Sequence, residues 1–435
     1  MKCGQKPTVA LLTGNSLCHN PRAVKEASAL ARAGYRVCVL GAWSHPDFKA
    51  RDRRLIEHLP FAFIPVFDLT APGLHNGISR LGWRAGKRAA DVWFDLTGWQ
   101  SPCQLGFAIE RMFRQALGMS ADLYLAHSEP CLYVAVRLLR HGRRVGVDME
   151  DWFSEDLLPE ARRHRPLRLL RALEGELLSH GAYASCPSQA MSAALAAEYG
   201  CPPPAVVYNA FAWSDRQALD GAAADRRNRT IPSIYWFSTT LGPGRGVEDL
   251  LAALPLLRHE VEIHLRGDPA PGFAEWIRTR IPEGWHDRIS LHPLVTNDQL
   301  LPRIAEHDIG FAGETSQCRS RDLTVTNKIL HYLLGGVAVV ASDTSGHREV
   351  ARQAPAAVHL YPSGDPGGLA ARLNALLASA ETLARAKIAA LAAAEHSFCW
   401  ERQERVLVDA VGCALGDAAR VSQSSPAPRV AGRPA

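Results

Sequence analysis

The chain has 435 residues, of which 47% are hydrophobic and 21% are charged, so collagen-like, coiled-coil and wholly disordered classes are excluded. The net charge of +5, from 49 basic and 44 acidic residues, is too weak over this length to indicate nucleic-acid binding. No apolar run of the sequence reaches the roughly 20 residues of a membrane-spanning helix. The ten cysteines are scattered without a Cys-x-x-Cys pair, which favours a reduced, cytoplasmic protein over a disulfide scaffold or a zinc site.

Short apolar runs alternate with helical patterns in the first half of the chain, which is typical of βαβ units and a parallel sheet. The expected strands are Thr8–Thr13, Arg36–Leu40, Asp122–Ala126, Arg144–Asp148, Ala182–Cys186 and Ala205–Tyr208. The expected helices are Pro21–Ala33, Pro130–Arg140, Pro166–Ser179 and Ser188–Tyr199. The stretch Leu59–Met119, rich in Trp, Gly and Arg, is expected to be an irregular insertion of loops and helices.

A polar segment, Asp215–Arg229, is the best candidate for a linker, and a second αβ series follows it. Its expected strands are Ser233–Phe237, Val261–Leu265, Ile289–His292, Ile309–Ala312, Ala338–Ala341 and Val358–Leu360, and Ala-rich helices fill Gly368–His396. We therefore expect an α/β fold of two Rossmann-like, doubly wound parallel-sheet domains that face a cleft, at residues 1–214 and 230–396, joined by a linker at 215–229. Residues 416–435 are expected to be a disordered tail, because Ser422–Ala435 has almost no apolar content beyond Ala and Val.

The clearest local motif is the glycine-rich turn of Ser238–Val247 (STTLGPGRGV). Gly242, Gly244 and Gly246 would let the backbone approach a ligand, and Arg245 adds a bidentate cation beside a helix N-terminus. These features suit a diphosphate, although the spacing does not match a dinucleotide fingerprint. A plain strand–helix turn that needs glycine for its dihedral angles explains the motif equally well.

A second motif is Thr326–Asp343 (TNKILHYLLGGVAVVASD). Thr326 or Asn327 can cap a helix whose first turn then contains Lys328. A cation at that end opposes the helix dipole at a cost of about 0.3–1 kcal/mol, so the placement makes more sense if an anion binds there. The alternative is a solvated lysine on a capped helix.

These two motifs together resemble the second domain of GT-B glycosyltransferases, in particular glycosyltransferase family 4. Arg245-Gly246 fits the family's basic residue and glycine, and Asn327–Val339 fits most of its Asn-Lys-x-x-Glu-Tyr-x-x-x-Gly-x-Pro-Val pattern. The resemblance continues through Asn20–Leu40, Ala121–Glu155, Ala182–Asn209 and Ser397–Val406. It implies that a C-terminal helix, at about 397–412, crosses back to the first domain.

The sequence departs from the family pattern at several positions. The Glu-x7-Glu pair of many members falls on Leu323 and His331, an expected Arg is Thr240, and an expected Pro is Ala338. Neutral His331 could hydrogen-bond a ribose hydroxyl or stack on a base. Glu314, which lies nearby in sequence, could compensate for the missing carboxylate. We therefore take Asn327, His331 and Glu314 as candidate nucleotide- or sugar-binding residues.

Polar residues follow the expected strands of the first domain. His127 comes just past one strand end, and Asp148 and Glu150 follow the next. With the resemblance, these three are candidates for a catalytic base that takes a proton from an acceptor hydroxyl. A satisfied loop histidine and a helix N-cap cluster are the alternative interpretations.

The acceptor side of the site is expected near the first strand–helix turn, which contains Gly14, Asn20 and Arg22. An N-cap followed by a proline at the first helical position already explains Asn20. Arg22 opposes the dipole of the helix that it begins, so it is a candidate to meet an anionic substrate.

The resemblance implies an enzyme that transfers a sugar from a nucleotide-diphosphate donor to a hydroxyl acceptor, a glycan or lipid-linked glycan in polysaccharide biosynthesis, with retention of configuration. We expect no cofactor and no metal, because no Asp-x-Asp motif calls for one, and we expect no nucleic-acid partner. Two alternatives stay open: a nucleotide-sugar 2-epimerase of the same fold, or a non-catalytic sugar-nucleotide-binding protein.

Arg80, Arg84, Lys87 and Arg88 are interleaved with Leu81, Trp83, Val92, Trp93 and Phe94, and a second basic stretch is Arg162–Arg171. This pattern can mark a helix that lies on a membrane surface, or a solvated basic face above a buried stripe. We expect a cytoplasmic protein and keep a peripheral position on the inner face of the membrane as an alternative.

Overall fold

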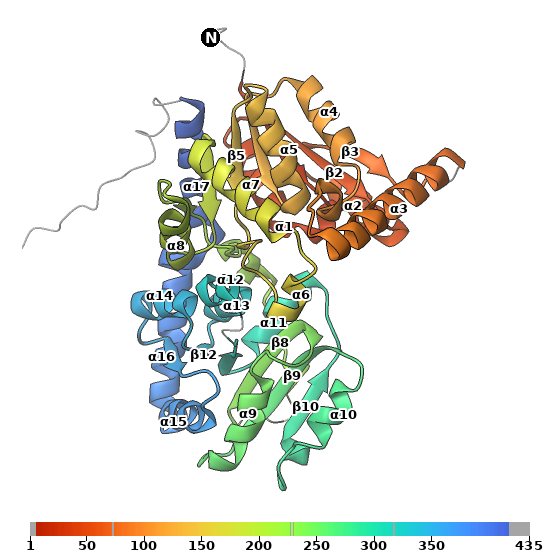
Figure 1. The fold of residues 1–435 in the computed structure, drawn as a ribbon. Helices are drawn as coiled ribbons and strands as arrows, with labels where there is room; N and C mark the ends of the chain where they lie inside the picture. Colours follow the sequence, from red (N-terminus) through yellow and green to blue (C-terminus); the bar gives the residue numbers. More distant parts are fainter. Residues whose placement is uncertain (1–5, 72–73, 227, 229, 316–317, 417–435) are drawn as a thin grey trace, which may run out of the picture.

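The computed structural model describes residues 6–71, 74–226, 228, 230–315 and 318–416. They form two α/β domains, each built on a parallel sheet, with the first domain at the top of Figure 1 and the second below it. The expected disordered tail, apart from Gly416, lies outside the described residues. Within the described ranges, no helix combines the length and apolar character needed to cross a bilayer.

The first sheet has seven strands in the order β3-β2-β1-β4-β5-β6-β7, and all neighbours pair in parallel. The strands are β1 (Thr8–Thr13), β2 (Arg36–Trp43), β3 (Ala62–Asp68), β4 (Leu123–His127), β5 (Val145–Asp148), β6 (Tyr183–Cys186) and β7 (Ala205–Val206). The helices are α1 (Pro21–Arg32), α2 (Pro46–Ile56), α3 (Leu74–Thr97), α4 (Ile109–Met119), α5 (Glu129–Arg140), α6 (Pro159–Arg162), α7 (Leu167–His180) and α8 (Gln189–Tyr199). The strand order reverses between β1 and β4, and such a switch point opens a crevice at the carboxyl ends of the strands.

The second sheet has six parallel strands in the order β10-β9-β8-β11-β12-β13. The strands are β8 (Ser233–Leu241), β9 (Glu262–Pro269), β10 (Ile289–His292), β11 (Ile309–Ala312), β12 (Ala338–Ser342) and β13 (Val358–Tyr361). The helices are α9 (Val247–Ala253), α10 (Phe273–Arg278), α11 (Asn297–Ala305), α12 (Arg319–Leu323), α13 (Asn327–Gly335), α14 (Ser345–Gln353), α15 (Pro366–Leu377) and α16 (Ala380–Ala393). The expected fold class, two doubly wound parallel-sheet domains, is therefore confirmed.

One expectation about the first domain is wrong in part. The stretch 59–119 is not only loops and helices, because it supplies the edge strand β3 as well as α3 and α4. Pro65 lies inside β3. A proline in a sequence argues against a strand, because it cannot donate a hydrogen bond to a neighbouring strand. An edge strand tolerates proline because only one of its sides pairs with a neighbour.

The last helix, α17 (Trp400–Leu415), runs along the side of the first domain (Figure 1). Trp400, Leu407 and Val411 are buried in the apolar cluster that also contains Val9 and Leu11 of β1. The chain thus crosses between the domains twice. The two crossings lie side by side, since the amide of Trp400 donates to the carbonyl oxygen of Phe211 at 2.8 Å.

Candidate active site

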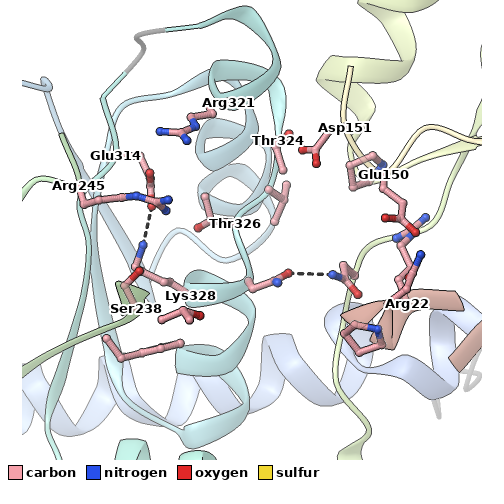
Figure 2. A pocket seen from close by; sticks show the side chains of 18 of the residues that line it. Arg22, Glu150, Asp151, Ser238, Arg245, Glu314, Arg321, Thr324, Thr326 and Lys328 are labelled. Atoms are coloured by element: carbon pink, nitrogen blue, oxygen red, sulfur yellow. Dashed lines mark hydrogen bonds and ion pairs between the residues drawn. The ribbon is translucent and has the colours of Figure 1, made fainter. Parts of the chain in front are cut away.

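The two domains enclose a cavity of about 440 Å³, seen from close by in Figure 2. Its walls come from loops at the carboxyl ends of both sheets, where parallel α/β folds bind ligands. The first domain contributes His19, Asn20, Pro21, Arg22, Glu150, Asp151, Pro187 and Asn209. The second contributes Phe237, Ser238, Thr239, Arg245, Glu314, Arg321, Thr324, Val325, Thr326, Asn327 and Lys328.

The wall from the second domain carries three cations, Arg245, Arg321 and Lys328, around one carboxylate (Figure 2). Lys328 Nζ donates to Glu314 Oε1 at 2.6 Å, and both side chains are buried. Burial lowers the pKa of Lys328 below its usual range, although Glu314 opposes that effect. Burial would raise the pKa of Glu314, but Lys328 and Arg245 hold it below its usual range, so the carboxyl group is ionised. The wall therefore keeps a net positive charge.

The glycine-rich turn Ser238–Val247 reaches the cavity through Ser238, Thr239 and Arg245. Gly246 has a φ of 79°, and a Cβ at this position would lie 2.6 Å from the Cα of Gly313, so only glycine fits. Gly244 has a φ of 73°, and its amide donates to Glu248 Oε1 at 2.8 Å. Gly246 therefore serves the close approach of the turn to the loop after β11, and none of Gly242, Gly244 and Gly246 lines the cavity.

Asn327 lies at the start of α13 and lines the cavity, as its expected role requires. Its Oδ1 accepts a hydrogen bond of 3.1 Å from Asn209 Nδ2 of the first domain. His331 lies one turn further on and is not among the lining residues. Its ring stacks on Phe211, with centroids 3.3 Å apart, and burial together with the charge of Lys25 lowers its pKa to about 3. The structure thus places His331, neutral, in the hinge between the domains.

Of the three candidates for a catalytic base, only Glu150 lines the cavity. His127 and Asp148 are fully buried behind it. His127 Nδ1 lies 2.9 Å from Glu150 Oε1 and 3.4 Å from Asp148 Oδ2, and its Nε2 lies 3.4 Å from Glu26 Oε2. The three residues are therefore brought together, with the imidazole holding Glu150, the member of the three that lines the cavity.

Arg22 also lines the cavity, but its guanidinium is bonded inward. It donates to both carboxylate oxygens of Asp148, at 2.5 and 2.7 Å, and to the carbonyl oxygen of Val207. Its Nε also lies 3.2 Å from Glu26 Oε1. Arg22 thus neutralises buried carboxylates behind the wall, besides any contact that it makes with a ligand.

The other two acceptor-side candidates have structural roles. Asn20 lines the cavity, and its Oδ1 accepts a hydrogen bond of 2.9 Å from the amide of Ala23 as the cap of α1. Gly14 is not a lining residue. A Cβ on Gly14 would lie 2.5 Å from Pro130 Cγ, and its amide donates to Ser128 Oγ at 3.0 Å, so it packs the turn after β1 against the turn after β4.

Glu26 is a member of the buried cluster that the sequence analysis did not identify. Burial and the charge of Asp148 raise its pKa to about 7, against the opposite effects of Arg22 and His127. Burial lowers the pKa of His127, but its three carboxylate neighbours raise it to about 9. Arg22 and Glu26 lie four residues apart on α1, which in a sequence is the usual spacing of an ion pair on a helix surface. The signal that could have found the cluster is that Glu26 shares its helix face with Ala23 and Leu30, which are apolar.

Two groups in the described part of the chain have the spacing of metal ligands: Glu26, His127 and Asp148, and Asp225, Glu306 and His307. An arginine already occupies each. Arg22 is bonded to Asp148 and lies beside Glu26, and Arg266 donates to Asp225 Oδ2 at 2.5 Å. These guanidinium groups supply the positive charge that a metal ion would otherwise bring.

Residues 232–379 match the family model of glycosyl transferases group 1. No curated protein matches the chain by sequence. Among solved structures, HepE from Anabaena, in complex with UDP and glucose, is 19% identical with a TM-score of 0.64, over 93% of this chain and 99% of that one. Sucrose-phosphate synthase from Thermosynechococcus elongatus is 14% identical with a TM-score of 0.67, over 92% of this chain and 96% of that one.

A putative UDP-N-acetylglucosamine 2-epimerase from Listeria monocytogenes is also similar, at 14% identity and a TM-score of 0.54, over 95% of this chain and 97% of that one. At these identities the likenesses establish the fold, which extends over both domains and their mutual arrangement. The resemblance expected from the sequence is thereby confirmed. The chain has the GT-B fold, and its residues 232–379 are similar in sequence to glycosyl transferases group 1.

Proposed function

We propose that this protein is a glycosyltransferase that moves a sugar from a nucleotide-diphosphate donor to a hydroxyl of a glycan or lipid-linked glycan. The observation that carries the proposal is the cavity between the domains, which is cationic on the second domain and carboxylate-lined on the first. Such a polarity suits a reaction that leaves negative charge on one reactant and removes a proton from the other. The family match of residues 232–379 supports a transferase.

The second domain would hold the donor. When the bond between the anomeric carbon and the diphosphate oxygen breaks, negative charge develops on the diphosphate. Arg245 and Lys328, fixed at the wall before the reaction, would stabilise that charge and so lower the barrier. Because two cations are already in place, we propose that transfer needs no metal ion, and activity should persist in the presence of EDTA.

The first domain would hold the acceptor. As the acceptor oxygen forms its bond to the anomeric carbon, Glu150 would take the hydroxyl proton, with His127 fixing the orientation of its carboxylate. A retaining course, which the family resemblance implies, brings the acceptor to the face from which the diphosphate departs, so that the diphosphate oxygen can take the proton instead. Glu150→Gln separates these routes: loss of turnover supports Glu150 as the base, and retained turnover supports the diphosphate. NMR of the product's anomeric centre reports the stereochemistry.

The proposal is tested by removing the cations of the donor wall. Arg245→Ala should lower kcat/KM by about 100-fold or more, because one preorganised charge is lost from the transition state. Lys328→Ala should be combined with Glu314→Gln, since the single change would leave a carboxylate buried without its partner. Full turnover in both variants would contradict the assignment of the site.

The matched control is Arg258→Ala, which removes an exposed arginine of the same domain that does not line the cavity. It should leave kcat/KM unchanged. Suitable donors are first found by the thermal shift of the protein with a panel of nucleotide sugars, followed by transfer assays with glycan acceptors.

The alternative function is that of an epimerase, because the fold is also similar to that of the Listeria protein. Incubation with donor alone decides between the two activities, because an epimerase needs no acceptor. A protein that binds the donor but yields no product under either condition would be a binding protein.

A further inference from the structure

Helix α3 presents an apolar face to solvent. In the described part of the chain thirteen large hydrophobic side chains are exposed, and six of them lie on α3 or just after it: Ile78, Leu81, Val92, Trp93, Leu96 and Trp99. Leu81 is 70% exposed and Leu96 is 75% exposed. Figure 1 shows α3 extending sideways from the first domain, and none of its residues lines the cavity.

The exposed residues form one continuous stripe. Ile78, Leu81, Val92 and Leu96 follow a helical spacing of three and four residues, and the two positions that complete the row are Ala85 and Ala89, both exposed. A helix of this length is about 36 Å long. The stripe is therefore an apolar band along most of α3, with no polar side chain inside it.

The opposite face of α3 packs on the domain, so the exposed stripe is a second apolar face of the helix. Ala90 is buried, and Trp83 lies edge-on to Phe67 of β3 with ring centroids 5.2 Å apart. Since one apolar face already anchors α3 and the described residues leave the second exposed, the second face is available to a partner.

The margin of the stripe is cationic. Arg84 and Arg88 are exposed along one edge, where Asp95 also lies, 3.1 Å from His164 Nδ1; Asp91 is paired with Lys87, so the helix keeps an excess of cations. Arg168, which is exposed on α7, donates to the carbonyl oxygen of Gly98 and so extends the cationic margin past the end of α3.

We propose that α3 docks this protein on an anionic lipid surface, lying in the plane of the interface with Leu81, Trp93 and Leu96 among the acyl chains. An apolar stripe with arginines at its edge matches both parts of such a surface, the hydrocarbon boundary and the negative headgroups. The tryptophans fit because indole combines an apolar body with a polar N–H. The proposal rests on α3 alone and is independent of the proposed glycosyl transfer.

The experiment measures co-sedimentation of the full chain with vesicles, without any nucleotide sugar. Binding is expected with mixed phosphatidylcholine and phosphatidylglycerol, and much weaker binding with phosphatidylcholine alone. Leu81→Gln combined with Leu96→Gln should weaken binding at least about ten-fold, because two leucines lose their apolar transfer energy. Arg84→Gln combined with Arg88→Gln should weaken binding to the anionic vesicles by roughly five-fold per charge and reduce its salt dependence.

Leu256→Gln combined with Ile388→Gln is the matched control, since both residues are exposed on the second domain. It should bind vesicles as the wild type does, and all variants should keep the wild-type melting temperature. The proposal is overturned if the wild type does not bind anionic vesicles or if the Leu81/Leu96 variant binds them equally well. It is also overturned if light scattering shows a dimer that this variant dissociates, because the stripe would then be covered by a second copy of the chain.

Discussion

At the scale of single residues, the most unusual feature is the buried cluster behind the cavity wall. Among the described residues, the cations within ion-pair distance of Glu26, Asp148 and Glu150 are Arg22 and protonated His127. A fully ionised cluster would thus carry an excess negative charge away from solvent, which is costly. The pKa of Glu26 is raised to about 7, so below that pH this residue holds the proton that removes the excess.

Glu26→Gln tests this protonation through the pH dependence of stability. In the unfolded chain Glu26 ionises near its ordinary pKa of 4.5, whereas in the folded chain it keeps its proton up to a pH of about 7. The unfolded state alone therefore releases a proton between these values, and wild-type stability falls there as the pH rises. Relative to the wild type, the variant should gain stability over that window, up to about 3 kcal/mol, and gain none below pH 4.5.

Thermal unfolding at a series of pH values measures that difference. Glu404→Gln is the control, because Glu404 pairs with Arg32 at the surface, and its difference from the wild type should not grow with pH. A constant difference for Glu26→Gln across the whole range would show that Glu26 is ionised in the native protein.

At the scale of elements, the turn from β8 to α9 depends on one glycine. Gly246→Ala adds a Cβ at a φ of 79° and within 2.6 Å of the backbone of Gly313, so strain and clash act together. We expect a loss of about 2–4 kcal/mol in the free energy of unfolding, measured with urea. Gly242→Ala, in the same turn, meets no atom closer than 3.7 Å and should change stability little.

The elements that could be predicted from the sequence are those with local signals. The strand at Thr8–Thr13 and the start of α9 at Val247 agree with the structure because buried apolar runs and glycine turns act over a few residues. The edge strand β3 was missed, since Pro65 argues against a strand unless its edge position is known.

The site was harder to predict, because burial is a property of tertiary packing. His331 resembles a ligand-binding position, yet Phe211, over a hundred residues away, covers it in the hinge.

At the scale of the whole molecule, the end of the chain completes the first domain. Leu407 on α17 is fully buried against residues of β1 and α1, whereas its neighbour Val406 is 41% exposed. Leu407→Ala should therefore cost about 2–5 kcal/mol of stability, through lost transfer energy and a residual cavity. Val406→Ala should cost less than about 0.5 kcal/mol. Calorimetry of Leu407→Ala would also show which domain is destabilised. Because α17 packs on the first domain, we expect the unfolding transition of that domain to shift to lower temperature.

The ion pair of Lys328 and Glu314 has a consequence for how long an anionic ligand stays in the cavity. The empty site already contains its own counter-ion, so an arriving anion must compete with Glu314 for the ammonium group. Binding of the anion thus replaces Glu314 as the partner of the ammonium group. The net binding free energy is therefore smaller than for an anion that meets an unpaired cation. The same exchange runs in reverse on departure, when Glu314 takes back the ammonium. Such an ion pair lowers the affinity of the cavity for an anionic ligand and favours rapid release of that ligand.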